Sequence, residues 1–202
     1  MASWIDDFEG NKLSSKWVPT RYSQGGQNDG VWRREIKDSK VYWVAVSQGT
    51  EGNRWGEILT LPVNAPGDII IEAPIRCKNA ANYGQMGIGV NHALYPSWER
   101  YGVTTYNEGI RYVFGSNVGT WTSFPGFPSK TYMGTYPTTD YSSIFKVKRK
   151  NGYIFLYADE KYLGSYAYAP TITTVDIIAW WNAIGVEHWI DWIKVTPSSV
   201  VL

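Results

Sequence analysis

Apolar and polar residues alternate along most of this chain, in short runs that end at Gly, Pro, Asn or Asp. A period of two is typical of β-strands that bury one face. No segment shows a convincing period of 3.6, so we expect at most a single helical turn, within 6–17. The runs predicted as strands are 31–38, 40–47, 54–60, 67–76, 84–91, 99–106, 109–115, 143–150, 152–159, 161–168, 174–181 and 187–195.

Many short strands without helices between them predict two packed antiparallel sheets, that is, an all-β sandwich. The chain has 202 residues, of which 44% are hydrophobic, and this suits one sandwich domain spanning 1–202. Cys77 is the only cysteine, so neither an internal disulfide nor a CxxC metal motif is possible.

Charge and hydropathy argue against two classes of partner. Lys and Arg number 19 and Asp and Glu 18, a net charge of +1, which gives no support for nucleic acid or an anionic membrane. No apolar run approaches the ~20 residues that span a bilayer, so we expect no membrane insertion. The first ten residues lack the basic and apolar regions of a signal peptide.

The segment 150–152, Lys-Asn-Gly, predicts a hairpin turn of the Asn-Gly type. In the strand before it, Lys146, Lys148 and Lys150 share one face. This lysine row is interpreted as a solvated outer face that discourages edge pairing, the alternative being a basic stripe that binds a ligand.

Aromatic residues make up 16% of the chain, with 11 Trp and 15 Tyr, more than a core needs. Either they fill a large sandwich, or some of them lie on a surface and stack on ligands. The segment 115–143 is expected to be a long loop, because it is rich in Gly, Pro, Ser and Thr. Its aromatic residues argue against disorder, so we expect it to form part of a recognition surface.

Four segments in this order resemble the concanavalin A-like lectin/glucanase superfamily, which includes laminin-G-like domains and lichenase-type β-glucanases. They are 4–17, the pair 67–76 and 86–90, the hairpin 145–166, and 190–197. In the hairpin, Glu160 stands where the family usually has glycine. The resemblance implies a jelly-roll sandwich whose concave face or rim loops take carbohydrate. It does not specify a function, because this fold carries lectins, hydrolases, lyases and adhesion modules.

Three ionisable residues, Glu187, His188 and Asp191, lie close together in the last predicted strand. In a regular strand His188 points away from the other two, so we expect it to be a surface or hydrogen-bonded residue. By the resemblance, Asp191 and the backbone at Asp7 match positions that hold a structural calcium on the convex side. The alternative is that Asp191 caps a strand end by hydrogen bonding to backbone.

The catalytic pattern of the related β-glucanases is E-x-D-x-E on one concave strand, which places an acid and a nucleophile ~5 Å apart. The corresponding strand here has Glu99 followed by Tyr101 and Val103, and Glu108 has the opposite parity. An enzymatic function is therefore less favoured than a non-catalytic one. Alginate-lyase-type sandwiches use Arg, Gln, His and Tyr, available here as Arg100, Gln85, His92 and Tyr106, without recognisable lyase motifs.

A non-catalytic, lectin-like module that binds a glycan or glycoprotein is the favoured function. Sugar C–H faces stack on aromatic rings and sugar hydroxyls bond to polar side chains. The expected ligand-binding residues are Trp121, Trp98, Tyr101, Tyr112, Trp180, Arg100, Asn91 and Asn107, whereas Trp17, Trp43 and Trp192 are assigned to the core.

Two alternatives stay open. One is a structural or adhesion module of a virion or cell-surface assembly, which would form a homo-oligomer. The other is a glycoside hydrolase or polysaccharide lyase with a non-standard site. The sequence does not identify a location, and we expect an extracellular or a cell- or virion-surface position, as part of a larger protein or assembly.

Overall fold

The computed structural model describes residues 4–23, 31–47, 55–65, 67–78, 85–91, 110–114, 118–122, 131–134, 140–167, 171–181 and 184–197. In this part of the chain all regular structure is β, as predicted, and no helix is long and apolar enough to cross a membrane. The strands are β1 (Trp4–Asp6), β2 (Val18–Ser23), β3 (Val31–Ile36), β4 (Val41–Ser47), β5 (Trp55–Ala65), β6 (Ile69–Lys78), β7 (Gln85–Val90), β8 (Ile110–Phe114), β9 (Val118–Thr122), β10 (Thr131–Gly134), β11 (Asp140–Lys150), β12 (Tyr153–Ala158), β13 (Lys161–Ala167), β14 (Ile172–Trp181), β15 (Glu187–Ile190) and β16 (Ile193–Pro197).

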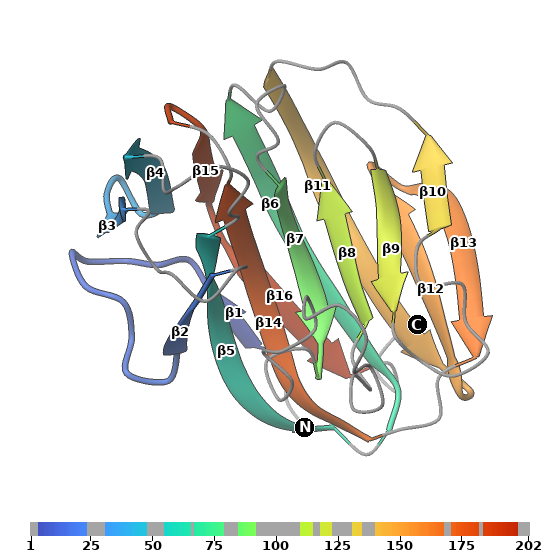
Figure 1. The fold of residues 1–202 in the computed structure, drawn as a ribbon. Helices are drawn as coiled ribbons and strands as arrows, with labels where there is room; N and C mark the ends of the chain where they lie inside the picture. The colour runs from blue at the N-terminus through green and yellow to red at the C-terminus, as the bar shows by residue number, and fades with distance from the viewer. Residues whose placement is uncertain are drawn as a thin grey trace.

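The strands form two antiparallel sheets that pack face to face, which confirms the predicted sandwich (Figure 1). The seven-stranded sheet has the order β10-β9-β8-β7-β14-β5-β2 and lies in front in Figure 1. The nine-stranded sheet has the order β13-β12-β11-β6-β15-β4-β3, and β16 pairs with both β6 and β1. The first and last strands are therefore neighbours.

The core lies between the sheets, and alternation along each strand supplies it. In β6 the side chains of Ile71, Ala73 and Ile75 are fully buried. Phe145 of β11 and Trp43 of β4 are the largest fully buried side chains. Of the rings assigned to the core from the sequence, Trp17 and Trp43 are buried as expected, while Trp192 is only half-buried.

The predicted last strand, 187–195, is two strands separated at Asp191 and Trp192. Ile190 pairs with Ile75 and Lys194 pairs with Glu72, so four steps along one strand match three along β6. The extra residue makes a β-bulge, which reverses the alternation. As a result His188 and Ile190 face the core before the bulge, and Ile193 and Val195 face it afterwards.

Two further expectations from the sequence are corrected. The segment 115–143 is not one loop, because it contains β9, β10 and the beginning of β11. Its Thr, Val and Tyr residues favour strands despite the glycines, and Gly119 pairs with Tyr132 inside the sheet. The strand β2 was not predicted because Pro19 interrupts the pattern, although proline is tolerated on an edge strand such as this one.

Two hairpins in the nine-stranded sheet turn through left-handed residues. The predicted turn between β11 and β12 has φ of +52° at Asn151 and +75° at Gly152. The turn between β12 and β13 has φ of +49° at Asp159 and +63° at Glu160. Positive φ at both central residues is the pattern of a type I′ hairpin, for which glycine is preferred.

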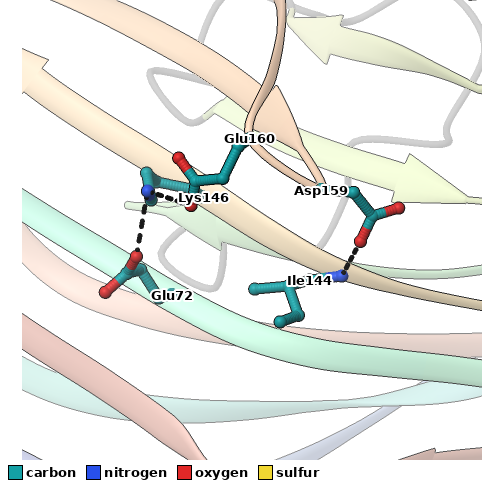
Figure 2. Close-up of polar contacts among 5 residues, drawn as sticks. All are labelled: Glu72, Ile144, Lys146, Asp159 and Glu160. Atoms are coloured by element: carbon teal, nitrogen blue, oxygen red, sulfur yellow. Dashed lines mark hydrogen bonds and ion pairs between the residues drawn. The ribbon is translucent and has the colours of Figure 1, made fainter.

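Side chains hold the turn at Asp159 and Glu160 in place (Figure 2). The Asp159 carboxylate accepts a hydrogen bond from the Ile144 N–H at 2.9 Å. It also accepts one from the Ser143 hydroxyl at 2.9 Å. The Lys146 ammonium lies 2.6 Å from a Glu160 oxygen and 3.1 Å from a Glu72 oxygen. Burial alone would lower the pKa of Lys146, but the bonds to Glu160 and Glu72 outweigh it and raise that pKa.

Candidate functional site

The face of the seven-stranded sheet that points away from the core carries a buried polar group. In β14, Val175 and Ile177 belong to the core, so Thr174 and Asp176 lie on the opposite, outer face. Both are nevertheless buried, and Asp176 is 0% exposed. The outer face of the seven-stranded sheet is therefore covered at its centre.

The strand register extends a row across this face from Asp176. Asp176 pairs with Thr60 of β5 on one side and with Gly89 of β7 on the other. Gly89 pairs with Arg111 of β8, which in turn pairs with Trp121 of β9. Cross-strand partners share a face, so all five positions lie on the outer face, in a row about 19 Å long.

The Asp176 carboxylate is the charged group of this row whose hydrogen bonds the structure describes. One of its oxygens accepts a hydrogen bond from the Thr174 hydroxyl at 3.1 Å. The hydroxyl of Thr60, 8% exposed, makes no hydrogen bond in the described part of the chain. Because Asp176 is fully buried, its carboxylate and the neighbouring hydroxyl groups form a polar group beneath the outer face.

The expected ligand-binding residues fall into three groups. The register puts the positions of Trp121 and Trp180 on the outer face, the latter opposite Gly56 and Gln85. Tyr112 pairs with Ile88, a core residue, so its position is on the core side of β8. Trp98, Arg100, Tyr101 and Asn107 lie outside the described residues.

Asn91 has a structural part at the end of β7. Its φ is +56°, and its side-chain oxygen accepts hydrogen bonds from the Thr173 N–H, the Thr173 hydroxyl and the Thr174 N–H. Its amide nitrogen donates to the Thr171 carbonyl at 2.8 Å. These bonds fix the start of β14 and hence the place of Thr174, while ligand binding by Asn91 stays a prediction.

The second carboxylate in the described strands of the seven-stranded sheet points the other way. Glu57 of β5 is buried between the sheets, where it accepts hydrogen bonds from the Trp43 indole and the Arg34 guanidinium. It therefore ties the two sheets together and does not reach the outer face. The other acidic candidates, Glu99 and Glu108, lie outside the described residues, as does His92.

The expected calcium position lies on the nine-stranded sheet. Asp6 pairs with Ile193, which brings the backbone at Asp7 close to the bulge that contains Asp191. One Asp191 oxygen pairs with the Arg76 guanidinium at 2.9 Å, and the other is buried without a hydrogen bond in the described part of the chain.

These donors fit calcium only in part. A second oxygen is available at Asp191, but Arg76 already balances its charge. Within the described ranges no three His, Cys, Asp or Glu residues cluster around a possible metal. Calcium at this position stays a prediction.

Sequence reasoning missed Asp176. The signal was present in 174–181, where an aspartate interrupts an apolar strand at one alternate position. Charged side chains are rarely fully buried unless they are paired or used in a site. His188, expected at the surface or in a hydrogen bond, is fully buried, so a surface position is wrong.

No family model and no curated protein matches this sequence. Solved structures do match its fold. The endo-β-1,3-glucanase from Pyrococcus furiosus superposes with a TM-score of 0.65 and 13% identity, over 95% of this chain and 92% of that one. The carbohydrate recognition domain of Emp47p superposes with a TM-score of 0.62 and 12% identity, over 96% of this chain and 94% of that one.

The Bacillus licheniformis β-glucanase also superposes, with a TM-score of 0.59 and 9% identity over 97% of this chain and 98% of that one. At such identities the likeness establishes the fold alone. The chain thus has the concanavalin A-like jelly-roll fold that the resemblance implied.

Proposed function

We propose that this chain is a carbohydrate-binding, lectin-like module, and that the outer face of its seven-stranded sheet takes the glycan. The observation that carries the proposal is the row that joins Asp176, Gly89, Arg111 and Trp121 on one face. Further support comes from the fold, which is shared with two glucanases and a carbohydrate recognition domain.

The row combines an aromatic residue with a buried polar group. The Trp121 indole offers a flat surface for the C–H groups of a pyranose. Asp176 is 0% exposed, so it supports this face from beneath through its hydrogen bond with Thr174. Gly89 lies between Asp176 and Trp121 in the row and has no side chain.

Binding without turnover is the finer part of the proposal. Retaining glycoside hydrolysis needs two carboxyl groups about 5 Å apart. The described strands contribute one carboxylate to this face, Asp176, so this part of the chain does not place two carboxyl groups there.

A glycan array followed by calorimetry on Trp121→Ala tests the proposal. If Trp121 is a recognition ring, its loss weakens binding by ~2 kcal/mol or more, about thirtyfold, with the melting temperature almost unchanged. Tyr153→Ala is the matched control, because Tyr153 is an aromatic residue, 50% exposed, on the other sheet. A stability loss of a few kcal/mol with unaltered binding would end the recognition role of Trp121.

Solution size separates this proposal from its main alternative. A lone sugar-binding module is expected to be a monomer that binds glycans, whereas an assembly or adhesion module forms a defined oligomer. Light scattering coupled to gel filtration measures this directly. A stable oligomer with no glycan binding would favour the assembly alternative.

A further inference from the structure

A second surface with ligand-binding features lies on the outer face of the nine-stranded sheet. A cavity of about 440 Å³ opens there, over β3, β4, β15 and β6. This volume is in the range of small-molecule sites. We call it the Trp189 cavity, and it is lined by Arg33, Glu35, Lys37, Asp38, Lys40, Tyr42, Arg76, Lys78, Glu187 and Trp189.

The register arranges the floor of the Trp189 cavity in two rows. In the first row, Trp189 of β15 pairs with Tyr42 of β4 and Arg76 of β6. Tyr42 pairs in turn with Glu35 of β3. The two aromatic residues are thus in the middle of this row, with a charged residue at each end.

The second row lies two residues along the strands, on the same face, and carries charge. Glu187 pairs with Lys78 on one side and with Val44 on the other, and Val44 pairs with Arg33. Adjacent strands are about 4.8 Å apart, so each row of four positions spans about 14 Å. That length accommodates two or three sugar rings.

The aromatic pair forms a platform. The rings of Tyr42 and Trp189 have centroids 6.4 Å apart and are tilted by 44°. The Lys78 ammonium lies 5.6 Å from the centroid of the Trp189 ring. Burial, together with a hydrogen bond to Glu187, raises the pKa of Tyr42 to about 12, so its hydroxyl remains a donor.

Three of the eight charged residues that line the Trp189 cavity form ion pairs, and the carboxylates of Asp38 and Glu187 form none with a described residue. Arg33 pairs with Glu35 at 2.7 Å, and Arg76 pairs with Asp191 at 2.9 Å. Three lysines line the cavity: Lys37, Lys40 and Lys78. None of them forms an ion pair with a described carboxylate.

Two of these lysines are fixed by a hairpin. Lys37 and Lys40 flank the turn between β3 and β4, and their backbones exchange hydrogen bonds of 3.0 and 3.1 Å. Both side chains therefore start from adjacent positions at one end of the cavity, while Lys78 stands beside Trp189. With five cationic and three acidic residues in its lining, the cavity has an excess of positive charge, which favours an anionic ligand.

We propose that the Trp189 cavity is a second site, which binds a sugar that carries a carboxylate or a sulfate. The pyranose stacks on Trp189, and Lys78, Lys37 and Lys40 bond to the anionic group. This site is on the opposite sheet from Asp176 and Trp121 and does not depend on the glycan site proposed there.

Calorimetry on the full chain tests this site with four probes. They are an oligogalacturonate, a sulfated chondroitin oligosaccharide, a neutral gluco-oligosaccharide and poly-glutamate. We expect one or both anionic sugars to bind at least tenfold more tightly than the other two probes. Which of them binds tells a carboxylate from a sulfate as the recognised group.

Variants locate the binding. Trp189→Ala and Lys78→Met are each expected to lower the affinity for the anionic sugar at least tenfold. Lys148→Met is the matched control, because Lys148 lies on the same outer face, on β11, but does not line the cavity. If Trp189→Ala does not fold, the affinity of Lys78→Met alone shows whether the anionic sugar binds in the Trp189 cavity.

Several results would overturn the second site. They are the absence of binding by both anionic sugars, equal binding of poly-glutamate, and wild-type affinity in folded Lys78→Met. Trp121→Ala should leave the anionic sugar unaffected. If Trp121→Ala removes that binding while Lys78→Met keeps it, the ligand sits on the seven-stranded sheet and the second site is wrong.

Discussion

The turn at Glu160 gives a sharp test of how far the local backbone decides stability. Glu160 has φ of +63°, in a position where type I′ hairpins prefer glycine. Its carboxylate pairs with Lys146 at 2.6 Å, although the Glu160 side chain is 76% exposed. Replacing Glu160 by glycine and, separately, by alanine distinguishes the ion pair from the backbone conformation, because both variants lose the carboxylate.

The expected magnitudes follow from these contacts. An exposed ion pair contributes about 0.2–1 kcal/mol, so Glu160→Ala should destabilise the protein by about that much. In the folded state, the left-handed conformation is unfavourable by about 1–2 kcal/mol for a residue with a Cβ. Glycine avoids this, but it makes the unfolded chain more flexible, which lowers the free energy of unfolding by about 0.4–1 kcal/mol. Glu160→Gly should therefore be about 0.5–1 kcal/mol more stable than Glu160→Ala.

Gly152 supplies the matched control in the neighbouring hairpin. Its φ is +75°, and an added Cβ would meet no atom within 4 Å, so Gly152→Ala changes only the backbone preference. We expect Gly152→Ala to lose about the same 0.5–1 kcal/mol. Urea unfolding at neutral pH measures all three variants. The reasoning fails if Gly152→Ala is destabilised but Glu160→Gly is no more stable than Glu160→Ala.

Three further predictions concern the sites and the pH dependence. We expect no turnover of mixed-linkage or laminarin-type β-glucans, and turnover that Glu99→Gln abolishes would contradict this and identify the acid. Calcium at a hundredfold excess over its Kd should raise stability by about 2.7 kcal/mol and have no effect in Asp191→Asn, whereas an unchanged melting temperature on chelation of a calcium-loaded sample would count against the site. Because the folded pKa of Tyr42, about 12, exceeds its ordinary value of 10.0, its stabilising effect persists below pH 10 and is lost as the pH rises towards 12. Tyr42→Phe should flatten that alkaline loss in denaturation curves, and identical slopes would refute it.

The sandwich was predictable because alternation and turn residues act locally. Asn151 and Gly152 alone specified a hairpin, and the structure has the expected positive φ at both. The strands β9 and β10 were not predicted, since their Gly and Thr content suits a loop equally well until a neighbouring strand provides partners. Pairing such as that of Thr131 with Thr120 depends on tertiary context, which a single sequence does not reveal.

The candidate sites were harder to predict because they depend on register between distant strands. Trp121 was singled out as a loop residue, yet its place on the outer face of the seven-stranded sheet comes from pairing with Arg111. The same reasoning applies to Asp176, whose neighbours Thr60 and Gly89 are far from it in sequence. Residue type identified possible chemistry, whereas only the ladder of pairs shows which residues share a face.

The bulge at Asp191 shows how one irregular residue serves both the core and the surface. In a regular strand, burying His188 and Ile190 would also turn Lys194 into the core. The extra residue reverses the alternation, so Ile193 and Val195 are buried and Lys194 stays exposed.

On the other side of the bulge, β6 contributes Pro74, which has no N–H to donate and is tolerated where the ladder is interrupted. Before the bulge, Glu187 and Trp189 alternate with the buried His188 and Ile190, so they lie on the outer face, next to Arg76 and Tyr42. Arg76 then reaches the bulge itself through its ion pair with Asp191. The bulge at Asp191 thus allows the last two strands to bury apolar residues, and it leaves Trp189 beside Tyr42 on the outer face. The Trp189 cavity therefore depends on how the last two strands pack in the sandwich.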